Sequence, residues 1–111
     1  MADASLHLNA EEYGKFIYDH RSELTLVDFY ADWCPHCRSV GPILEGIARN
    51  YKAKKVNVVK IDTEKDGALA TQYTVDYLPT IVMMKDEKEL DRLIGGQSAP
   101  ALEEFVRKYL R

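Results

Sequence analysis

The chain has 111 residues, of which 46% are hydrophobic and 30% are charged, with a net charge of −3. This length and composition predict one globular domain, residues 1–111, that can bury its own core. Acidic and basic residues are scattered along the chain, so no basic block favours nucleic acid as a partner. No apolar run approaches the length of a membrane span, which excludes a membrane as a predicted partner.

The start of the chain has neither the charged region nor the apolar region of a signal peptide, so we expect a cytoplasmic location. Nothing in the sequence indicates an obligate dimer, and a monomer is expected. Cys34 and Cys37 are the only cysteines. Two cysteines are too few for a disulfide scaffold, so the pair is expected to carry chemistry.

The predicted elements begin with a weak strand at residues 5–8. A helix of about 11 residues follows, behind a capping box formed by Asn9 and Glu12. Residues 24–31 are nearly continuously apolar or β-branched, which is typical of a central strand covered on both faces. Asp28 is a polar residue in the middle of that strand.

A turn at residues 32–33 leads to a helix that begins at Pro35. This helix should kink at Pro42, because proline removes a backbone donor and its ring crowds the preceding turn. Residues 55–62 predict the next strand, and residues 64–73 predict a short helix with an apolar inner side.

Residues 80–84 predict another strand, and residues 85–88 a turn. Residues 89–94 alternate as a half-buried strand that ends at the glycines 95–96. Ser98 is expected to cap the last helix. The order βαβαβαββα indicates an α/β fold with a central mixed sheet and helices on both faces.

The spacing of the cysteine pair places Cys34 at the N-cap of the helix that starts at Pro35. Backbone N–H groups and the positive end of the helix dipole then favour the thiolate, so the pKa of Cys34 should fall. Pro35 suits the first helical position. A protonated His36 in the same turn would lower the pKa further. Cys37, one turn into the helix, should be more buried and act as the resolving thiol.

Two other readings of the pair are open. A zinc site needs four ligands and one CxxC pair supplies two, so His7 and His20 would have to complete it from distant positions. The cysteines could also be buried structural residues, although a helix N-cap is a reactive place for a thiol. Redox chemistry without a metal or an organic cofactor is the favoured interpretation.

Five stretches of the chain occur in a characteristic order: residues 27–38 (VDFYADWCPHCR), 41–44 (GPIL), 60–62 (KID), 78–80 (LPT) and Gly95. Together they resemble the thioredoxin family over essentially the whole chain, with almost no gaps. The resemblance implies a thioredoxin fold, which agrees with the predicted order of elements. It also implies a protein-disulfide oxidoreductase whose cysteine pair is reduced again by a thioredoxin reductase after each reaction.

The resemblance further implies roles for individual residues. Cys34 would be the attacking nucleophile and Cys37 the resolving cysteine. Asp28 matches a buried aspartate that exchanges protons with the resolving thiol, and desolvation should raise its pKa. Lys60 matches a lysine near that aspartate. Without the family, Asp28 could instead face outward and Lys60 could be a solvated edge residue.

The remaining matches concern the substrate surface. Trp33 would lie beside the active site, although it could equally be a core aromatic. Pro79 would be a cis-proline facing the disulfide, with Leu78 pairing in strand-like fashion with a substrate peptide; a trans loop proline is the alternative. Gly95 would allow close backbone approach, or else simply end a strand.

The chain departs from the family between its cysteines, where Pro35 and His36 replace the usual Gly-Pro. Because His36 should stabilise the Cys34 thiolate, it should make the disulfide a stronger oxidant than that of an ordinary thioredoxin. Tyr30 stands where many thioredoxins have a second tryptophan, and the turn at residues 86–88 lacks the usual glycine.

The sequence therefore predicts a thiol–disulfide oxidoreductase acting on protein disulfides. A disulfide oxidase or isomerase is the first alternative, favoured by His36 and opposed by the missing signal peptide. A non-enzymatic binding module with the same fold is the second, and retention of both cysteines opposes it.

Overall fold

The computed structural model describes residues 4–110. Five strands form one sheet in the order β1-β3-β2-β4-β5. Strands β1, β3 and β2 are parallel, whereas β4 is antiparallel to β2 and β5 is antiparallel to β4. The strands are β1 (Leu6–His7), β2 (Leu24–Tyr30), β3 (Val56–Asp62), β4 (Thr80–Lys85) and β5 (Lys88–Ile94).

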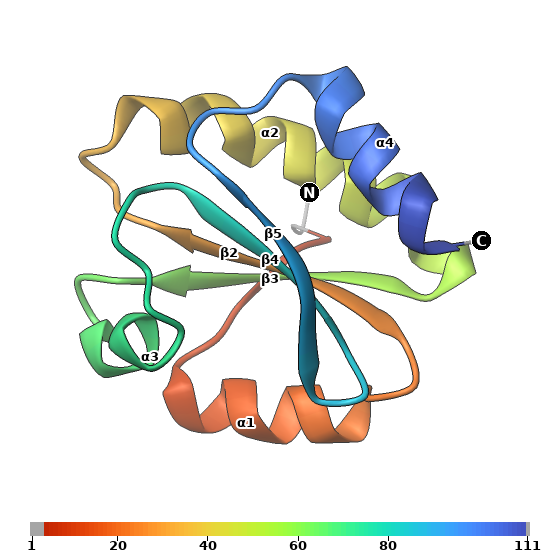
Figure 1. Cartoon of the computed structure of the whole chain (residues 1–111), viewed down its shortest axis with the longest axis horizontal. Helices are drawn as coiled ribbons and strands as arrows, with labels where there is room; N and C mark the ends of the chain where they lie inside the picture. Colours follow the sequence, from red (N-terminus) through yellow and green to blue (C-terminus); the bar gives the residue numbers. More distant parts are fainter. Residues whose placement is uncertain (1–3, 111) are drawn as a thin grey trace.

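Helices cover both faces of this mixed sheet, as the sequence predicts. Helices α1 and α3 lie on one face and α2 and α4 on the other (Figure 1). In the described part of the chain, no helix is long and apolar enough to cross a membrane. The helices are α1 (Ala10–Asp19), α2 (Pro35–Asn50), α3 (Gly67–Gln72) and α4 (Ala99–Leu110), and a 3₁₀ turn (Lys52–Lys54) follows α2.

The two-residue period of β2 divides its side chains between two cores. Leu24 and Leu26 pack into the core beneath α2 and α4, whereas Val27 and Phe29 pack into the core that α1 and α3 cover. Side chains of a strand alternate between faces. Asp28 therefore lies on the same face as Leu24 and Leu26, beneath α2.

The capping box of α1 forms as predicted, with Asn9 and Glu12 each accepting the other's backbone N–H. Helix α2 runs through Pro42 without interruption, and the kink expected there stays a prediction. Helix α3 is shorter than the predicted 64–73. Its predicted first turn is instead a loop in which the Asp62 carboxylate accepts the Glu64 N–H at 2.9 Å.

The hairpin between β4 and β5 turns without a glycine. Asp86 and Glu87 both adopt positive φ angles, 54° and 62°, as the two central residues of a type I′ turn do. The half-buried alternation expected for residues 89–94 is not found. The first three residues of β5 are exposed and the next three are partly buried, because β5 is an edge strand with a register shift opposite Met83 and Met84.

Candidate functional site

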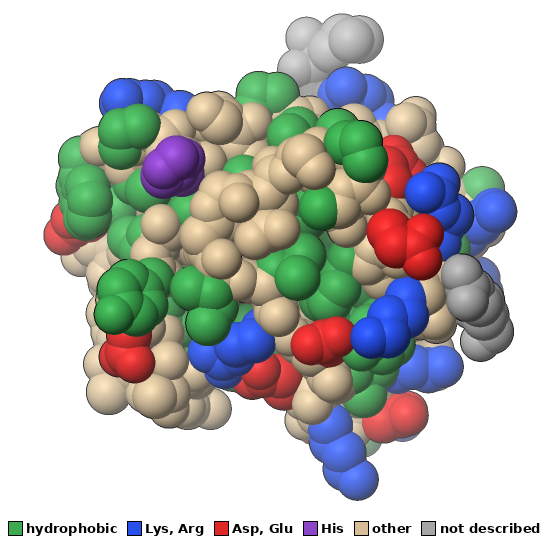
Figure 2. Space-filling model, turned by 45° about the horizontal axis from the view of Figure 1, so that its top comes forward, with side chains coloured by type: hydrophobic (Ala, Val, Ile, Leu, Met, Phe, Trp, Pro, Cys, Tyr) green, Lys and Arg blue, Asp and Glu red, His purple; other side chains and the backbone are tan. Residues whose placement is uncertain are grey.

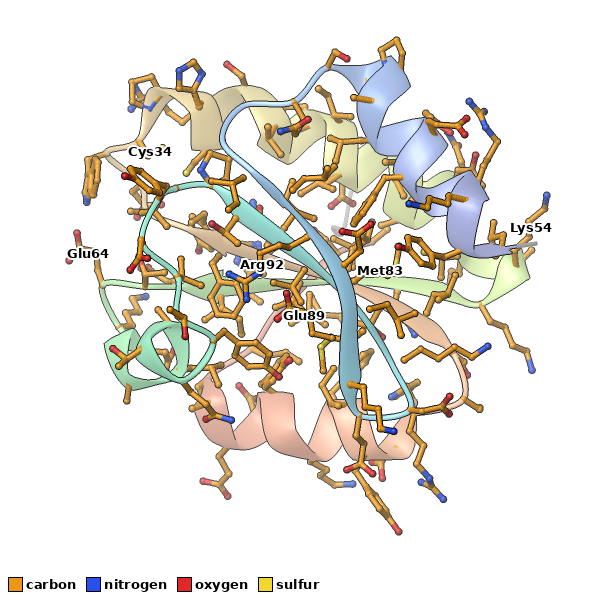
Figure 3. The ribbon with its side chains drawn as sticks, viewed as in Figure 1. Cys34, Lys54, Glu64, Met83, Glu89 and Arg92 are labelled. Carbon is orange, nitrogen blue, oxygen red and sulfur yellow. The ribbon has the colours of Figure 1, made fainter. Side chains whose placement is uncertain are left out.

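Cys34 is the N-cap residue of α2, where β2 has ended and the chain turns into the helix (Figure 3). Its sulfur accepts the backbone N–H of Cys37 at 3.3 Å. Its thiol also donates to the carbonyl oxygen of Leu78 at 3.7 Å. The predicted capping position is therefore confirmed. A sulfur held there faces the positive end of the helix dipole.

Cys37 lies one turn into α2, and both cysteines are free thiols. The expectation that Cys37 is the more buried of the two is wrong, since each is 4% exposed. Their electrostatic surroundings differ instead. Burial, followed by the hydrogen bond with Cys34, raises the pKa of the Cys37 thiol to about 12. Cys37 therefore needs a base before it can act as a nucleophile.

Asp28 lies in β2 and is fully buried, so the outward-facing alternative is wrong. Neither carboxylate oxygen has a hydrogen-bond partner among the described residues. Desolvation raises the pKa of Asp28 to about 6, and the nearby charge of Lys60 offsets part of this effect. The Asp28 carboxylate also contributes to the raised pKa of Cys37. A carboxyl group that titrates near neutral pH suits proton exchange with a thiol.

Lys60 is the register partner of Asp28 across the parallel pair of β2 and β3. It is partly buried, with its Nζ 4.7 Å from the centre of the Tyr30 ring. Helix α2 passes over it at Gly41, where an added Cβ would lie 3.6 Å from Nζ. The alternative of a freely solvated edge lysine does not describe this position.

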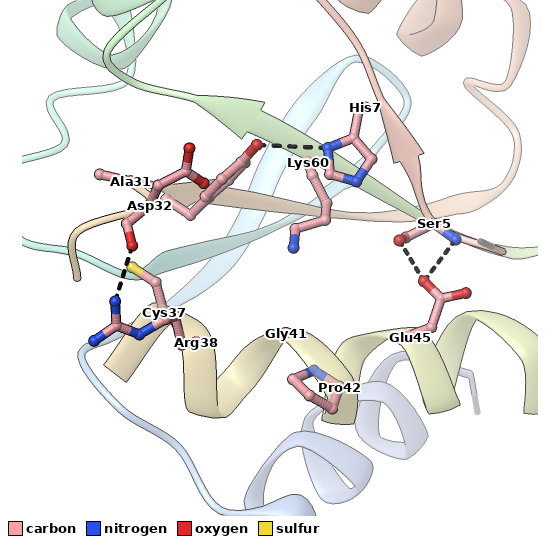
Figure 4. Close-up of a pocket in the computed structure, with 11 residues that line it drawn as sticks. Ser5, His7, Ala31, Asp32, Cys37, Arg38, Gly41, Pro42, Glu45 and Lys60 are labelled. Atoms are coloured by element: carbon pink, nitrogen blue, oxygen red, sulfur yellow. Dashed lines mark hydrogen bonds between the residues drawn. The ribbon is translucent and has the colours of Figure 1, made fainter. Parts of the chain in front are cut away.

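Lys60 and Cys37 line one cavity of about 360 Å³ between the sheet and α2 (Figure 4). On the same wall, Arg38 donates to the carbonyl oxygen of Asp32 at 3.3 Å. A cavity of this size has room for several waters. It therefore gives solvent a route to the buried side of the cysteine pair.

The loop before β4 faces the cysteine pair through the carbonyl of Leu78, and the Leu78–Pro79 peptide bond is cis, as the resemblance implies. The loop after β5 is tied to it, since the N–H of Gly95 donates to the carbonyl of Pro79 at 2.8 Å. Close approach is not why residue 95 is glycine, because a Cβ there would meet open space. The reason is its φ of +87°, which glycine adopts without strain.

Trp33 is 64% exposed, so it is not a core aromatic. Its indole N–H donates to the carboxylate of Glu64.

Pro35 occupies the first position of α2, as predicted. Figure 2 shows hydrophobic side chains gathered at the left end of the molecule, where β2 leads into α2 in Figure 1.

The position of His36 differs from the expectation that it lies with the Cys34 sulfur. Its imidazole lies against the backbone of Gly96 in the loop after β5, close enough that a Cβ on Gly96 would come within 2.9 Å of Nδ1. The structure gives it no hydrogen bond to either sulfur among the described residues. Any effect of His36 on Cys34 therefore acts through space.

Sequence reasoning missed two residues of this surface. The His36 ring packs against Gly96. Tyr77 is a 70% exposed aromatic residue directly before Leu78. An aromatic residue beside the Leu-Pro pair was the available signal for Tyr77. Nothing in the sequence indicated the contact between Gly96 and His36. Among residues 4–110, no group of three metal-binding side chains gathers.

This arrangement defines a class of protein, since an N-capping cysteine, a second cysteine one turn later and a facing cis-proline loop serve thiol–disulfide exchange. The thioredoxin family model matches residues 4–108. A thioredoxin of Staphylococcus saprophyticus is 34% identical over 90 residues, covering 81% of this chain and 86% of the relative. A thioredoxin-like protein of Synechocystis is 46% identical over 77 residues, covering 69% and 72%.

Solved structures agree with these relatives. A mutant thioredoxin from Halobacterium salinarum superposes with a TM-score of 0.87 at 29% identity, covering 100% of this chain and 96% of the other. The thioredoxin of Fasciola hepatica gives 0.83 at 33% identity, covering 92% and 97%. The chain belongs to the thioredoxin family of thiol–disulfide oxidoreductases. Members of this family use a redox-active cysteine pair and no external cofactor.

Proposed function

We propose that this chain reduces disulfide bonds in protein substrates, with Cys34 as the nucleophile. The observation that carries the proposal is the Cys34 sulfur at the N-cap of α2, 3.3 Å from the Cys37 N–H. In the first step the Cys34 thiolate attacks one substrate sulfur. A mixed disulfide forms, the substrate S–S bond breaks, and the second substrate sulfur leaves as a thiolate.

Cys37 then resolves the mixed disulfide. Its thiol gives its proton to the Asp28 carboxylate, directly or through water in the cavity that Lys60 lines. The Cys37 thiolate attacks the Cys34 sulfur, the bond between Cys34 and the first substrate sulfur breaks, and that first sulfur leaves as a thiolate. Two electrons have then moved from the cysteine pair to the substrate, and the pair is left as the Cys34–Cys37 disulfide.

The substrate backbone would pair with Leu78 beside Pro79, and Trp33 and the loop at Gly95 would complete the groove. The exposed Trp33 ring and the hydrogen bond that joins Gly95 to Pro79 support this surface. Such pairing supplies affinity through the main chain, whereas neighbouring side-chain pockets supply specificity.

The reduction potential should be higher than that of a thioredoxin with Gly-Pro between its cysteines. A protonated His36 stabilises the Cys34 thiolate and hence the reduced form of the pair. Because the ring lies on Gly96 and is exposed to solvent, we expect an effect of about 1 kcal/mol, or roughly 20 mV for this two-electron couple. A potential equal to that of the His36→Pro variant would contradict this part of the proposal.

The direct test is reduction of insulin with a thioredoxin reductase as electron donor. Wild-type protein should turn over, and Cys34→Ser should not. An oxidase or isomerase is the alternative that His36 favours, and oxidation of a reduced peptide by the disulfide form measures that activity under the same conditions. A Cys34→Ser variant that retains full cellular function would instead indicate a binding module.

We further propose that the chain acts in the cytoplasm as a monomer and a single domain. The family is typically reduced by thioredoxin reductase, which supports that enzyme as the electron donor. Size-exclusion chromatography of the reduced protein at micromolar concentration tests the monomer.

A further inference from the structure

A second cavity, of about 460 Å³, is lined by Cys34 and is separate from the one that Lys60 and Cys37 line. Trp33, Val75, Tyr77 and Leu78 contribute apolar surface to it, and Asp76 contributes a carboxylate. Because Cys34 and Leu78 both border it, a side chain next to the reacting cysteine of a substrate can reach it. The reduction of protein disulfides does not by itself require this cavity.

The aromatic walls of the cavity are exposed. Trp33 and Tyr77 are 64% and 70% exposed. The indole N–H of Trp33 donates to Glu64, and the backbone carbonyl of Tyr77 accepts the Thr80 hydroxyl at 2.6 Å. The hydrogen bond to Glu64 orients the Trp33 ring, and large aromatic side chains offer apolar contact area at little cost in conformational entropy.

The charges of the cavity are of one sign. Asp76 is exposed, and no lysine or arginine of the described chain lines the cavity. Glu64 adds a second carboxylate at the Trp33 ring. The hydrogen bond with Glu89 does most to raise the pKa of Arg92, and the charge of Asp76 adds to this effect. The Arg92 guanidinium itself donates to the carboxylate of Glu89 and to the carbonyl of Tyr73. The negative charge of Asp76 is therefore available to a ligand.

We propose that this cavity is a specificity subsite for a lysine or arginine side chain that flanks the disulfide-bonded cysteine of a substrate protein. The aliphatic stem of that side chain packs on the exposed rings of Trp33 and Tyr77. Its cationic head lies at Asp76, and an aromatic face attracts a cation as well. The inference rests on the proposed function, because it assigns the flanking residue of a substrate that Cys34 attacks.

The test uses three peptides that differ only beside their cysteine, where they carry arginine, leucine or glutamate. Each peptide cysteine is disulfide-bonded to thionitrobenzoate, so reduction by the full-length reduced protein releases a coloured thiol. The kcat/KM for arginine should exceed that for leucine by about threefold and that for glutamate by about tenfold, as expected for partly exposed charge and cation–π contacts. The arginine preference should shrink as salt is raised.

Two variants remove the parts of the subsite separately. Asp76→Asn should lower the arginine-to-leucine ratio to about one, because it removes the charge and keeps the shape. Tyr77→Ala should raise KM for both the arginine and leucine peptides about threefold, because it removes apolar contact area. The matched controls are Asp86→Asn in the β4–β5 turn and Tyr18→Ala on α1. Asp86→Asn should leave the arginine-to-leucine ratio unchanged, and Tyr18→Ala should leave both KM values unchanged.

Equal rates for the three peptides would overturn the subsite while leaving the proposed function intact. A preference for leucine that Asp76→Asn does not alter would also overturn it, because the cavity would then take an apolar side chain. Failure to reduce any peptide or insulin would be a failure of the proposed function itself.

Discussion

The imidazole of His36 lies on the backbone of Gly96, two residues that are 60 positions apart in the chain. A Cβ on Gly96 would come within 2.9 Å of His36 Nδ1, so any larger residue at position 96 must push the ring away. The ring is therefore held by the loop after β5 rather than by a hydrogen bond to a sulfur. Gly96 therefore decides where the His36 imidazole lies.

We expect Gly96→Ala to make the reduction potential more negative by about 10–20 mV. The displaced imidazole moves into solvent, and its attraction for the Cys34 thiolate is weakened by less than about 1 kcal/mol. Equilibration with a glutathione redox buffer measures the potential. In a His36→Pro background the same alanine should have no effect, and a shift of equal size there would rule out an action through His36.

The buried carboxyl of Asp28 should make the fold less stable as the pH rises. Its pKa in the folded chain is raised from 3.8 to about 6, so the folded state holds the proton more tightly than the unfolded state. The resulting stabilisation is fully present below pH 4 and is lost as the pH rises through 6. The free energies of unfolding of wild type and Asp28→Asn, measured with urea, should diverge over this range by about 3 kcal/mol. The value for wild type should fall relative to that of the variant. Parallel pH profiles for the two proteins would argue against a raised pKa.

Asp28→Asn should also slow the resolution of the mixed disulfide. The raised pKa of Cys37, about 12, leaves the thiol dependent on a base, and the variant removes the buried carboxylate whose charge acts on Cys37. Loss of that carboxylate also removes one cause of the raised pKa, so we expect a loss of about tenfold at pH 7, below the full range for a general base.

Acid quenching and mass spectrometry of the Cys34–substrate adduct measure this step. The adduct should accumulate transiently in Asp28→Asn and permanently in the Cys37→Ser control. Since hydroxide deprotonates Cys37 at high pH, the deficit of Asp28→Asn should narrow as the pH rises. A deficit independent of pH would show that Asp28 acts through structure alone.

Gly95→Ala should destabilise the chain by about 1–2 kcal/mol, because residue 95 has a φ of +87° that disfavours a side chain. Open space surrounds the position, so the cost is backbone strain and not a clash. Gly14→Ala is the matched control. Position 14 lies within α1 and is also open, so alanine there should stabilise the fold by about 0.5–1 kcal/mol. Thermal unfolding compares the two, and equal effects would contradict the assignment of strain to position 95.

The sequence was enough to predict the elements that local chemistry controls. The capping box of Asn9 and Glu12, the N-capping Cys34 and the apolar strand around Asp28 are read from neighbouring residues, and all three form as predicted. Boundaries were predicted less well. The turn in which Asp62 accepts the Glu64 N–H replaced the first residues expected for α3, because a side chain there competes with helical hydrogen bonds.

By itself, the sequence determined the reactive cysteine pair, the order of the elements and, through resemblance, the family. The cysteine pair and the individual elements depend on spacing within short segments, and the family depends on the order of several such segments along the chain. Only the tertiary structure decided that His36 lies on Gly96, that Gly95 is required by its φ, and that Tyr77 and Asp76 border a cavity at Cys34. These relationships join loops that are distant in the chain, and the packing of the sheet edges and helices, which no local pattern encodes, brings them together.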